Sequence, residues 1–215
     1  MEKAQIKSKI STERQFDIWA KTYDVGIWSQ YFKRSTNFVK NYIDNVALSE
    51  GTLLDIGCGT GDLCLKMCYS KSFDKIIGVD VSTEMLKQAN IKKSNLGLNK
   101  VTFVKSLAEE LPLESNSVDV ITCLNSFHHH DQKKTVGEVK RVLKKSGLFL
   151  VLDPVIDGPV RITWAHMLKK IFKEPDVKYF SKKDLFNLAR DNGLSLQNQI
   201  PFMYFTCLTV MKKND

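Results

Sequence analysis

The chain has 215 residues, a length that suits one full-size domain. Hydrophobic residues make up 43% of it and charged residues 26%, and these fractions exclude disordered, collagen-like and fibrous proteins. No apolar run approaches the roughly 18 residues that a membrane span needs. Because residues 1–10 also lack an apolar signal core, we expect a cytoplasmic protein.

The formal net charge is +8, and lysines far outnumber arginines. Such a charge suits an anionic substrate, nucleic acid or a membrane surface, although a lysine-rich proteome would give the same balance. Specific recognition of phosphates and bases relies on the forked guanidinium of arginine. The composition therefore weakens a nucleic-acid role without excluding it.

The cysteines are expected to be small buried thiols. Their number is odd and no C-x-x-C pair occurs, so we predict neither a disulfide framework nor a metal site. The five positions are Cys58, Cys64, Cys68, Cys123 and Cys207.

The predicted elements begin with a helical region over residues 11–46, where Phe16, Trp19 and Tyr23 recur at helical spacing. Short apolar strands then alternate with helices, a pattern typical of a parallel sheet covered on both faces. A long connection follows, then a helix and two strands that are close in sequence and therefore antiparallel. The expected strands are 52–56, 75–80, 101–104, 117–124, 147–153, 194–200 and 202–211, and the expected later helices begin at 62, cover 82–93 and 132–144, and cover 182–191.

A glycine-rich turn joins the first strand to the first of these helices. Gly57, Gly59 and Gly61 allow a sharp turn and let a ligand approach the backbone. Asp80 ends the second strand, 21 residues after Gly59, where a carboxylate can accept both hydroxyls of an adenosine ribose. Together these features predict a nucleotide-type site.

The acids around this turn distinguish two kinds of ligand. A dinucleotide fingerprint requires G-x-G-x-x-G, whereas this loop reads G-x-G-x-G followed by Asp62. Asp55, just before the loop, adds further negative charge. Both carboxylates oppose a pyrophosphate and suit a ligand that carries an ammonium and a sulfonium. We therefore predict S-adenosylmethionine (SAM) as the cofactor rather than a nicotinamide dinucleotide.

The segment L-L-D-I-G-C-G-T-G-D-L (53–63) resembles the first motif of class I SAM-dependent methyltransferases, and I-I-G-V-D-V-S-T-E-M-L (76–86) resembles the second. The resemblance continues through residues 108–121 and the strand at 147–153. F-D-I-W-A-K-T-Y-D (16–24) is similar to the N-terminal helix of the ubiquinone/menaquinone methyltransferase-like branch. Because this branch methylates several kinds of atom, the resemblance implies the reaction and leaves the substrate open.

The resemblance implies an α/β, Rossmann-like fold with a seven-stranded, mostly parallel sheet, one antiparallel strand and helices on both faces. It implies one domain, with product S-adenosylhomocysteine (SAH) released after transfer. The parts would be a helical cap (1–48), a cofactor-binding core (50–153), a substrate lid (154–180), and a last helix with a strand hairpin (181–215). A monomer and a homodimer both remain open.

The same resemblance implies roles for particular residues. Asp55 and the glycine loop would hold the methionine end of SAM, Asp80 would hold the ribose, and Tyr23 would cover the methionine end. Leu107 departs from the family pattern, because many relatives have there an acid that binds the adenine amino group. The remaining cofactor-binding candidates are Gly57, Cys58, Gly59, Gly61, Val81, Met85, Ala108, Glu109 and Asn125.

A histidine run follows the fourth strand, beside the expected ligand crevice. Adjacent residues point to different sides, so three imidazoles would not converge on one metal ion. His128 and His129 are candidates for a general base, and Asn125 for positioning the nucleophile. Methyl transfer can also proceed without a base, because the sulfonium is already a strong donor and in-line placement is the main requirement.

The acceptor is expected to be a small molecule, and lysines in and after the 154–180 insertion would suit an anionic one. Two alternatives stay open: an RNA or protein acceptor, and a non-catalytic SAM-binding protein. The insertion lysines in question are Lys169, Lys170, Lys173, Lys178, Lys182 and Lys183.

Overall fold

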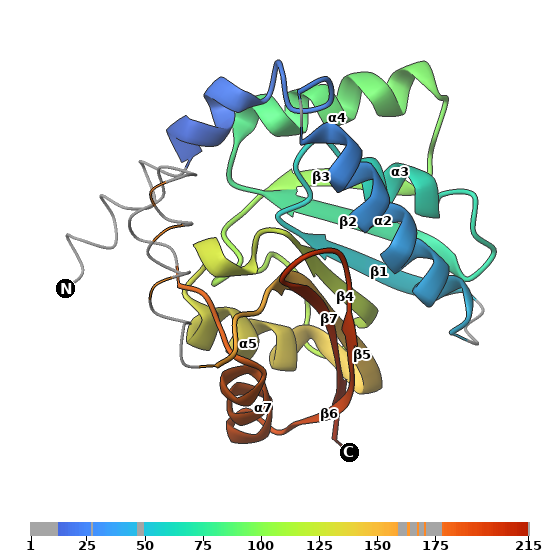
Figure 1. The fold of residues 1–215 in the computed structure, drawn as a ribbon. Coiled ribbons are helices and arrows are strands. Elements are labelled where there is room, and N and C mark those ends of the chain that lie inside the picture. Colours follow the sequence, from blue (N-terminus) through green and yellow to red (C-terminus); the bar gives the residue numbers. More distant parts are fainter. Residues whose placement is uncertain are drawn as a thin grey trace.

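The computed structural model describes residues 13–26, 28–46, 50–158, 163, 167, 170 and 178–214. A seven-stranded sheet runs through its centre, with helices on both faces (Figure 1). The strands are β1 (Gly51–Ile56), β2 (Phe73–Asp80), β3 (Val101–Lys105), β4 (Val118–Leu124), β5 (Leu143–Pro154), β6 (Leu194–Pro201) and β7 (Thr206–Lys213).

The strand order is β3-β2-β1-β4-β5-β7-β6. Neighbouring strands are parallel from β3 to β5, and β7 is antiparallel to both β5 and β6. The predicted single antiparallel strand is therefore confirmed as β7. The chain moves outward from β1 to β3 and returns to β4, so the strand order reverses between β1 and β4, where ligands of such sheets bind.

Successive residues of the central strands enter two cores on opposite faces of the sheet. Leu53 packs with α2 and α3, whereas Leu54 packs with α5 and α7. A 3-10 turn, η1 (Phe127–His129), follows β4. The helices are α2 (Ser29–Asp44), α3 (Asp62–Met67), α4 (Thr83–Asn95), α5 (Gln132–Val142) and α7 (Lys182–Asp191).

Hydrogen bonds and turns fix several boundaries that the sequence pattern placed differently. The helical region 11–46 is broken: residues 13–19 are helical, residues 20–25 form turns, and α2 begins at Ser29. The helix predicted to end at 144 ends at Val142, because the chain is already extended at Leu143. The last strand begins at Thr206 rather than 202, because Phe202 and Thr206 close a turn with Tyr204 at φ 58°.

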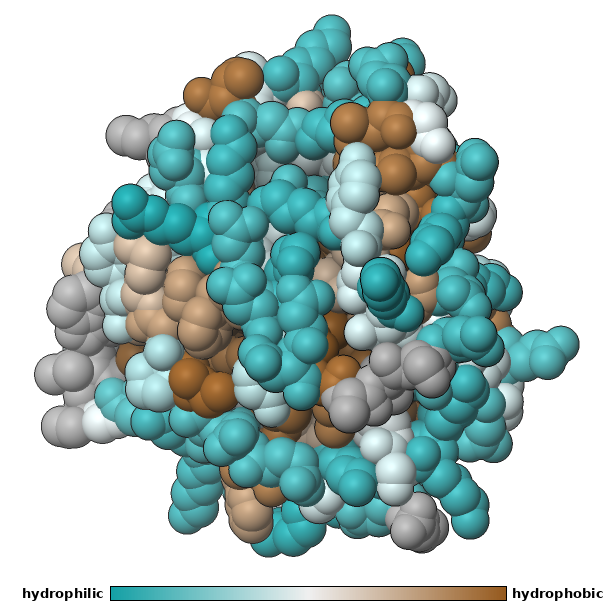
Figure 2. All heavy atoms as spheres, turned by 90° about the vertical axis from the view of Figure 1, so that its right-hand side faces the viewer, coloured by the Kyte–Doolittle hydropathy of each residue, from teal (hydrophilic) through white to brown (hydrophobic). Residues whose placement is uncertain are grey.

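All five cysteines are buried and free, as predicted. None of the described helices is long and apolar enough to cross a bilayer. The face on the right of Figure 1 is largely hydrophilic, with smaller apolar areas between the polar side chains (Figure 2).

Candidate active site

The turn after β1 needs glycine for two different reasons. Gly57 has φ 66°, and a Cβ there would lie 2.5 Å from Ser126 Oγ. Gly59 has φ 51°, but a Cβ there would meet nothing closer than a Tyr23 ring carbon at 3.9 Å. Gly57 thus allows close packing within the protein, whereas Gly59 leaves open space beside Tyr23, as a backbone that a ligand approaches should.

Asp80 is held at the end of β2 by backbone donors. Its Oδ2 accepts a hydrogen bond from Gly59 N at 2.8 Å, and its Oδ1 accepts one from Ser82 N at 2.9 Å. Burial raises the pKa of Asp80, and these backbone N–H groups oppose that rise. The carboxylate therefore ties the glycine loop to the start of α4, where Ser82 caps the helix by accepting from Met85 N.

Asp55 lies in the interior, just before the loop, and only 4% of it is exposed. Its Oδ1 accepts a hydrogen bond from Thr122 Oγ1 at 2.7 Å, and its Oδ2 accepts one from Cys64 Sγ at 3.7 Å. Burial is the main cause that raises the pKa of Asp55 to about 7, and the charges of Asp80 and Asp62 add to the rise. A carboxyl with this pKa can become ionised when a cation approaches it.

Two cavities meet at the carboxyl ends of β1 and β4. The larger has a volume of about 310 Å³ and the smaller about 60 Å³. Tyr23, Gly57, Leu124 and Asn125 line both, so the two are neighbours. The Tyr23 ring is stacked on Phe32 at 4.7 Å, and burial raises its pKa.

The predicted adenosine residues surround the larger cavity. Its wall includes Asp80, Val81, Met85, Ala108 and Glu109. The wall also includes Leu107, the residue that departs from the family pattern. Glu109 also has a structural contact, because its Oε1 accepts a hydrogen bond from Asp131 N at 2.8 Å.

Of the predicted methionine-end residues, Asp55 and Gly57 line the smaller cavity, together with the cofactor-binding candidate Cys58, whereas Gly59 lines the larger one. Gly61 lines neither cavity. A Cβ at Gly61 would lie 2.6 Å from the Phe103 ring, so this glycine serves packing between the loop and β3.

The N-terminal helical segment, residues 13–19, borders the larger cavity through Glu13 and Phe16 and is held by two acids. Glu13 Oε1 pairs with Lys105 Nζ at 2.6 Å. Asp17 Oδ1 accepts a hydrogen bond from Ser82 Oγ at 2.6 Å and a longer one from Glu84 N. These contacts attach the segment to the rim of the cavity, and nothing in the apolar periodicity predicted them.

The three histidines occupy different surroundings. His129 and His130 line the larger cavity, whereas His128 lines neither of the two. His129 is half-buried and packs edge-on against the Phe16 ring at 5.2 Å, and the loss of solvent around its imidazole lowers its pKa well below the usual value. His128 Nδ1 lies 2.7 Å from Asp153 Oδ1.

Asn125, at the end of β4, has φ 53° and contacts a residue that sequence reasoning missed. Tyr31 Oη donates a hydrogen bond to Asn125 Oδ1 at 2.9 Å. Tyr31 lies within the predicted helical region 11–46, whose pattern gave no sign of a polar contact with the end of β4. Asp153 was also missed, although its place at the carboxyl end of a buried strand matches the signal that identified Asp80.

Comparisons with known proteins agree with this geometry. A family model described as a methyltransferase domain matches residues 48–194. An uncharacterized methyltransferase of Bacillus subtilis, YcgJ, is 40% identical over 162 residues, which cover 73% of this chain and 63% of the relative. A demethylmenaquinone methyltransferase of Oceanobacillus iheyensis is 34% identical over 125 residues, which cover 57% of this chain and 52% of the relative.

The chain thus spans between half and two thirds of the length of these two relatives. The crystal structure of the Bacillus subtilis YcgJ protein has the same fold, with a TM-score of 0.73 and 24% identity over 85% of this chain and 99% of that one. The matched residues include the glycine loop, Asp80 and strands β1 to β5, and the two cavities lie at the carboxyl ends of β1 and β4. The chain belongs to the methyltransferase domain family, as its first two motifs predicted.

Proposed function

We propose that this chain is a SAM-dependent methyltransferase that moves a methyl group to a small-molecule acceptor by in-line displacement. The observation that carries the proposal is the pair of neighbouring cavities, one bordered by the ribose-type acid Asp80 and the other by the buried acid Asp55. When bound, SAM supplies a methyl group on a positively charged sulfur, which needs no further activation. The protein has to orient the reactants and exclude water.

Each wall residue then has a distinct task. Asp80 accepts hydrogen bonds from the ribose hydroxyls, and Asp55 faces the ammonium of the methionine end. Val81, Met85 and Ala108 enclose the adenine. Gly59 lets the methionine end approach the backbone, Gly57 and Cys58 border the smaller cavity beside it, and Gly61 shapes the loop behind them.

Tyr23 lines both cavities and covers the methionine end. Asn125 lines both cavities, so it is placed to orient the acceptor beside the transferred methyl group. His129 also borders the larger cavity, and its lowered pKa keeps the imidazole neutral near pH 7. His128 lines neither cavity and acts indirectly, through its contact with Asp153.

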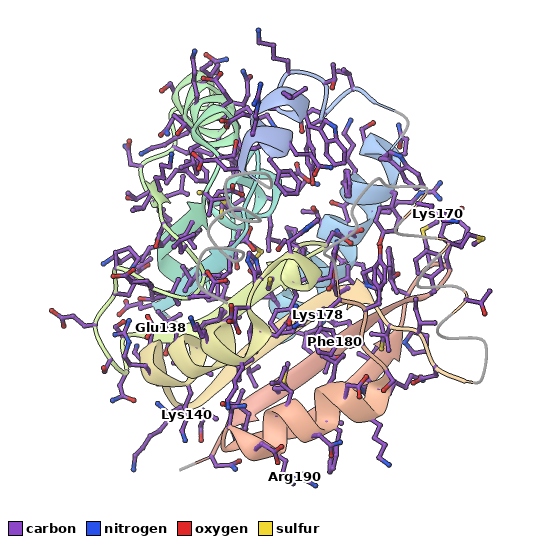
Figure 3. The ribbon with its side chains drawn as sticks, turned by 90° about the vertical axis from the view of Figure 1, so that its left-hand side faces the viewer. Glu138, Lys140, Lys170, Lys178, Phe180 and Arg190 are labelled. Atoms are coloured by element: carbon purple, nitrogen blue, oxygen red, sulfur yellow. The ribbon has the colours of Figure 1, made fainter. Side chains whose placement is uncertain are left out.

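Each part of the chain has its own role in this function. We assign residues 1–48 to the cap, 50–153 to the cofactor core, 154–180 to the substrate lid, and 181–215 to the closing helix and hairpin of a single cytoplasmic domain. Residues 1–12 and most of 159–177 lie outside the described residues. The anchored segment with Glu13 and Asp17 supports the cap assignment. Of the predicted lid lysines, Lys170 is exposed and Lys178 lies near η1 (Figure 3), whereas Lys169 and Lys173 fall outside the described residues.

Calorimetric titration with SAM, SAH and NADH tests the proposal. We expect micromolar binding of both adenosyl ligands and none of NADH. Asp55→Ala and Asp80→Ala should each weaken SAM binding strongly, while Asp119→Ala, at an acid of β4 paired with Lys144 away from the cavities, should not. Binding of NADH alone, or unchanged SAM affinity in both variants, would contradict the site assignment.

A further inference from the structure

Asp153 is an almost fully buried carboxylate at the end of β5, with 2% of its surface exposed. Its Oδ1 lies 2.7 Å from His128 Nδ1. A carboxylate only accepts hydrogen bonds, so Nδ1 carries the proton and donates it. The second oxygen, Oδ2, is buried as well and accepts no hydrogen bond from the described residues.

A buried oxygen in this state costs free energy, and native proteins keep few of them unless a ligand or water completes the contact. The oxygen of Asp153 can therefore accept a hydrogen bond from a donor outside the described residues. His128 cannot supply it, because its Nδ1 proton already points at Oδ1.

The position of Asp153 indicates where that donor comes from. Asn125, which lines both cavities, donates its backbone N–H to Leu152 O at 2.7 Å, so it lies beside the end of β5. Tyr31, bonded to Asn125 Oδ1, is close enough to Asp153 for the carboxylate charge to add to the rise of the Tyr31 pKa that burial causes. Asp153 thus adjoins the residues that border the proposed transfer site.

Aromatic rings lie against both His128 and Tyr31, the two residues that connect Asp153 with the site. The ring of Tyr179 is stacked on His128 at 5.7 Å, and Lys178 N donates to His128 O (Figure 3). The ring of Phe202 lies 6.2 Å from the ring of Tyr31. An unsatisfied acceptor with such aromatic neighbours suits a ring that carries a single polar donor.

We propose that Asp153 Oδ2 binds the methyl acceptor through an O–H or N–H group and receives that proton during transfer. This inference rests on the proposed function. The acceptor oxygen or nitrogen forms a bond to the methyl carbon, the bond from that carbon to sulfur breaks, and its electron pair stays on sulfur. The proton passes to the carboxylate, while His128 holds the carboxylate in place through Oδ1.

The test uses the full chain saturated with SAH and three probes of nearly the same shape: phenol, aniline and toluene. Calorimetry should show phenol or aniline binding about ten-fold or more tightly than toluene, because a hydrogen bond to a charged group adds that much. A preference for phenol assigns an O–H acceptor, and a preference for aniline assigns an N–H acceptor. Equal affinities, or no binding of either donor probe, would overturn the proposal.

Asp153→Asn provides the matching variant. Its amide oxygen can still accept from His128 Nδ1, and its NH₂ group then replaces Oδ2, so the acceptor becomes a donor. We expect phenol and aniline to fall to the affinity of toluene while SAH affinity stays within about three-fold of the wild type, which also reports that the variant is folded. Asp157→Asn is the control, because Asp157 is exposed and contacts Lys182 N.

The results separate the two proposals. Failure of the wild-type chain to bind SAH would count against the proposed function itself. SAH binding with no preference among the probes, or a preference that survives in Asp153→Asn, would count only against the role of Asp153. If the variant does not fold, the ranking of the three probes on the wild type still decides the inference.

Discussion

The raised pKa of Asp55 predicts that SAM binding depends on pH in a particular way. In the empty protein this carboxyl has a pKa of about 7, mainly because it is buried. Binding of the ligand ammonium favours the ionised form, so below pH 7 the site must first lose a proton. At pH 5.5 this lowers the association constant about 30-fold relative to a fully ionised site, which corresponds to about 2 kcal/mol.

Above pH 8 the affinity should fall again, because an α-amino group loses its proton with a pKa of about 8. Titration of SAM by calorimetry from pH 5.5 to 9 should therefore give a bell-shaped affinity profile. Asp55→Asn should remove the acid limb, and adenosine, which has no amino-acid end, should show no such limb with either protein. An acid limb of equal size in Asp55→Asn would refute the assignment of Asp55 to the ammonium.

The raised pKa of Asp55 also makes the free energy of unfolding depend on pH. The folded state holds a proton on Asp55 between pH 3.8 and about 7 that the unfolded state has lost, so stability falls as the pH rises through this range. The full effect is about 4 kcal/mol. Asp55→Asn should therefore gain stability relative to the wild type at pH 8, and urea unfolding should show this advantage shrinking toward pH 4.

Three further predictions follow from the geometry of the site. Gly57→Ala should lower the free energy of unfolding by about 2–5 kcal/mol through backbone strain and a clash with Ser126. Gly59→Ala should lower it by only about 1–2 kcal/mol but should weaken SAH binding. Equal losses of unfolding free energy in the two variants would contradict the open space at Gly59. Asp17→Ala should detach one end of the N-terminal segment and speed SAH dissociation several-fold in stopped-flow measurements, with little change in melting temperature. Leu107→Asp should strengthen SAM binding several-fold by restoring a partner for the adenine amino group, and an unchanged affinity would show that packing alone holds the adenine.

The sheet could be predicted from sequence because its strands are short, apolar and separated by helical segments. The glycine loop and Asp80 could be predicted for a related reason. The loop lies within one strand-loop-helix unit and Asp80 ends the adjacent strand, so the order of these elements along the chain determines where the two meet. The boundaries that shifted, at Leu143 and Thr206, depend on hydrogen bonds that an apolar pattern does not record.

The acceptor side of the site could not be predicted in the same way. Tyr31 meets Asn125 across 94 positions of sequence, and Asp17 meets Ser82 across 65. Such contacts depend on how α2 and the N-terminal segment lie over the sheet, which periodicity does not specify. Asp153 is different, since an acid at the carboxyl end of a buried strand is a readable signal, and only its pairing with His128 needed the structure.

The net charge of the chain was a poor guide to the charge of the site. A formal charge of +8 suggested an anionic substrate. Yet the described walls of the two cavities contain six carboxylates and a single lysine, Lys33. Three of the six, Glu13, Asp24 and Asp62, pair with lysines outside the walls, whereas Asp55 and Asp80 are held by uncharged donors. Lysines elsewhere on the chain set the total, whereas acids at the ends of β1 and β2 set the local field, and Asp153 adds a further one at the end of β5. Burying carboxylates there is unfavourable unless a cation offsets it, so the site suits a ligand with an ammonium and a sulfonium. An anionic acceptor would have to be recognised outside these walls, whereas an acceptor that donates a proton fits them.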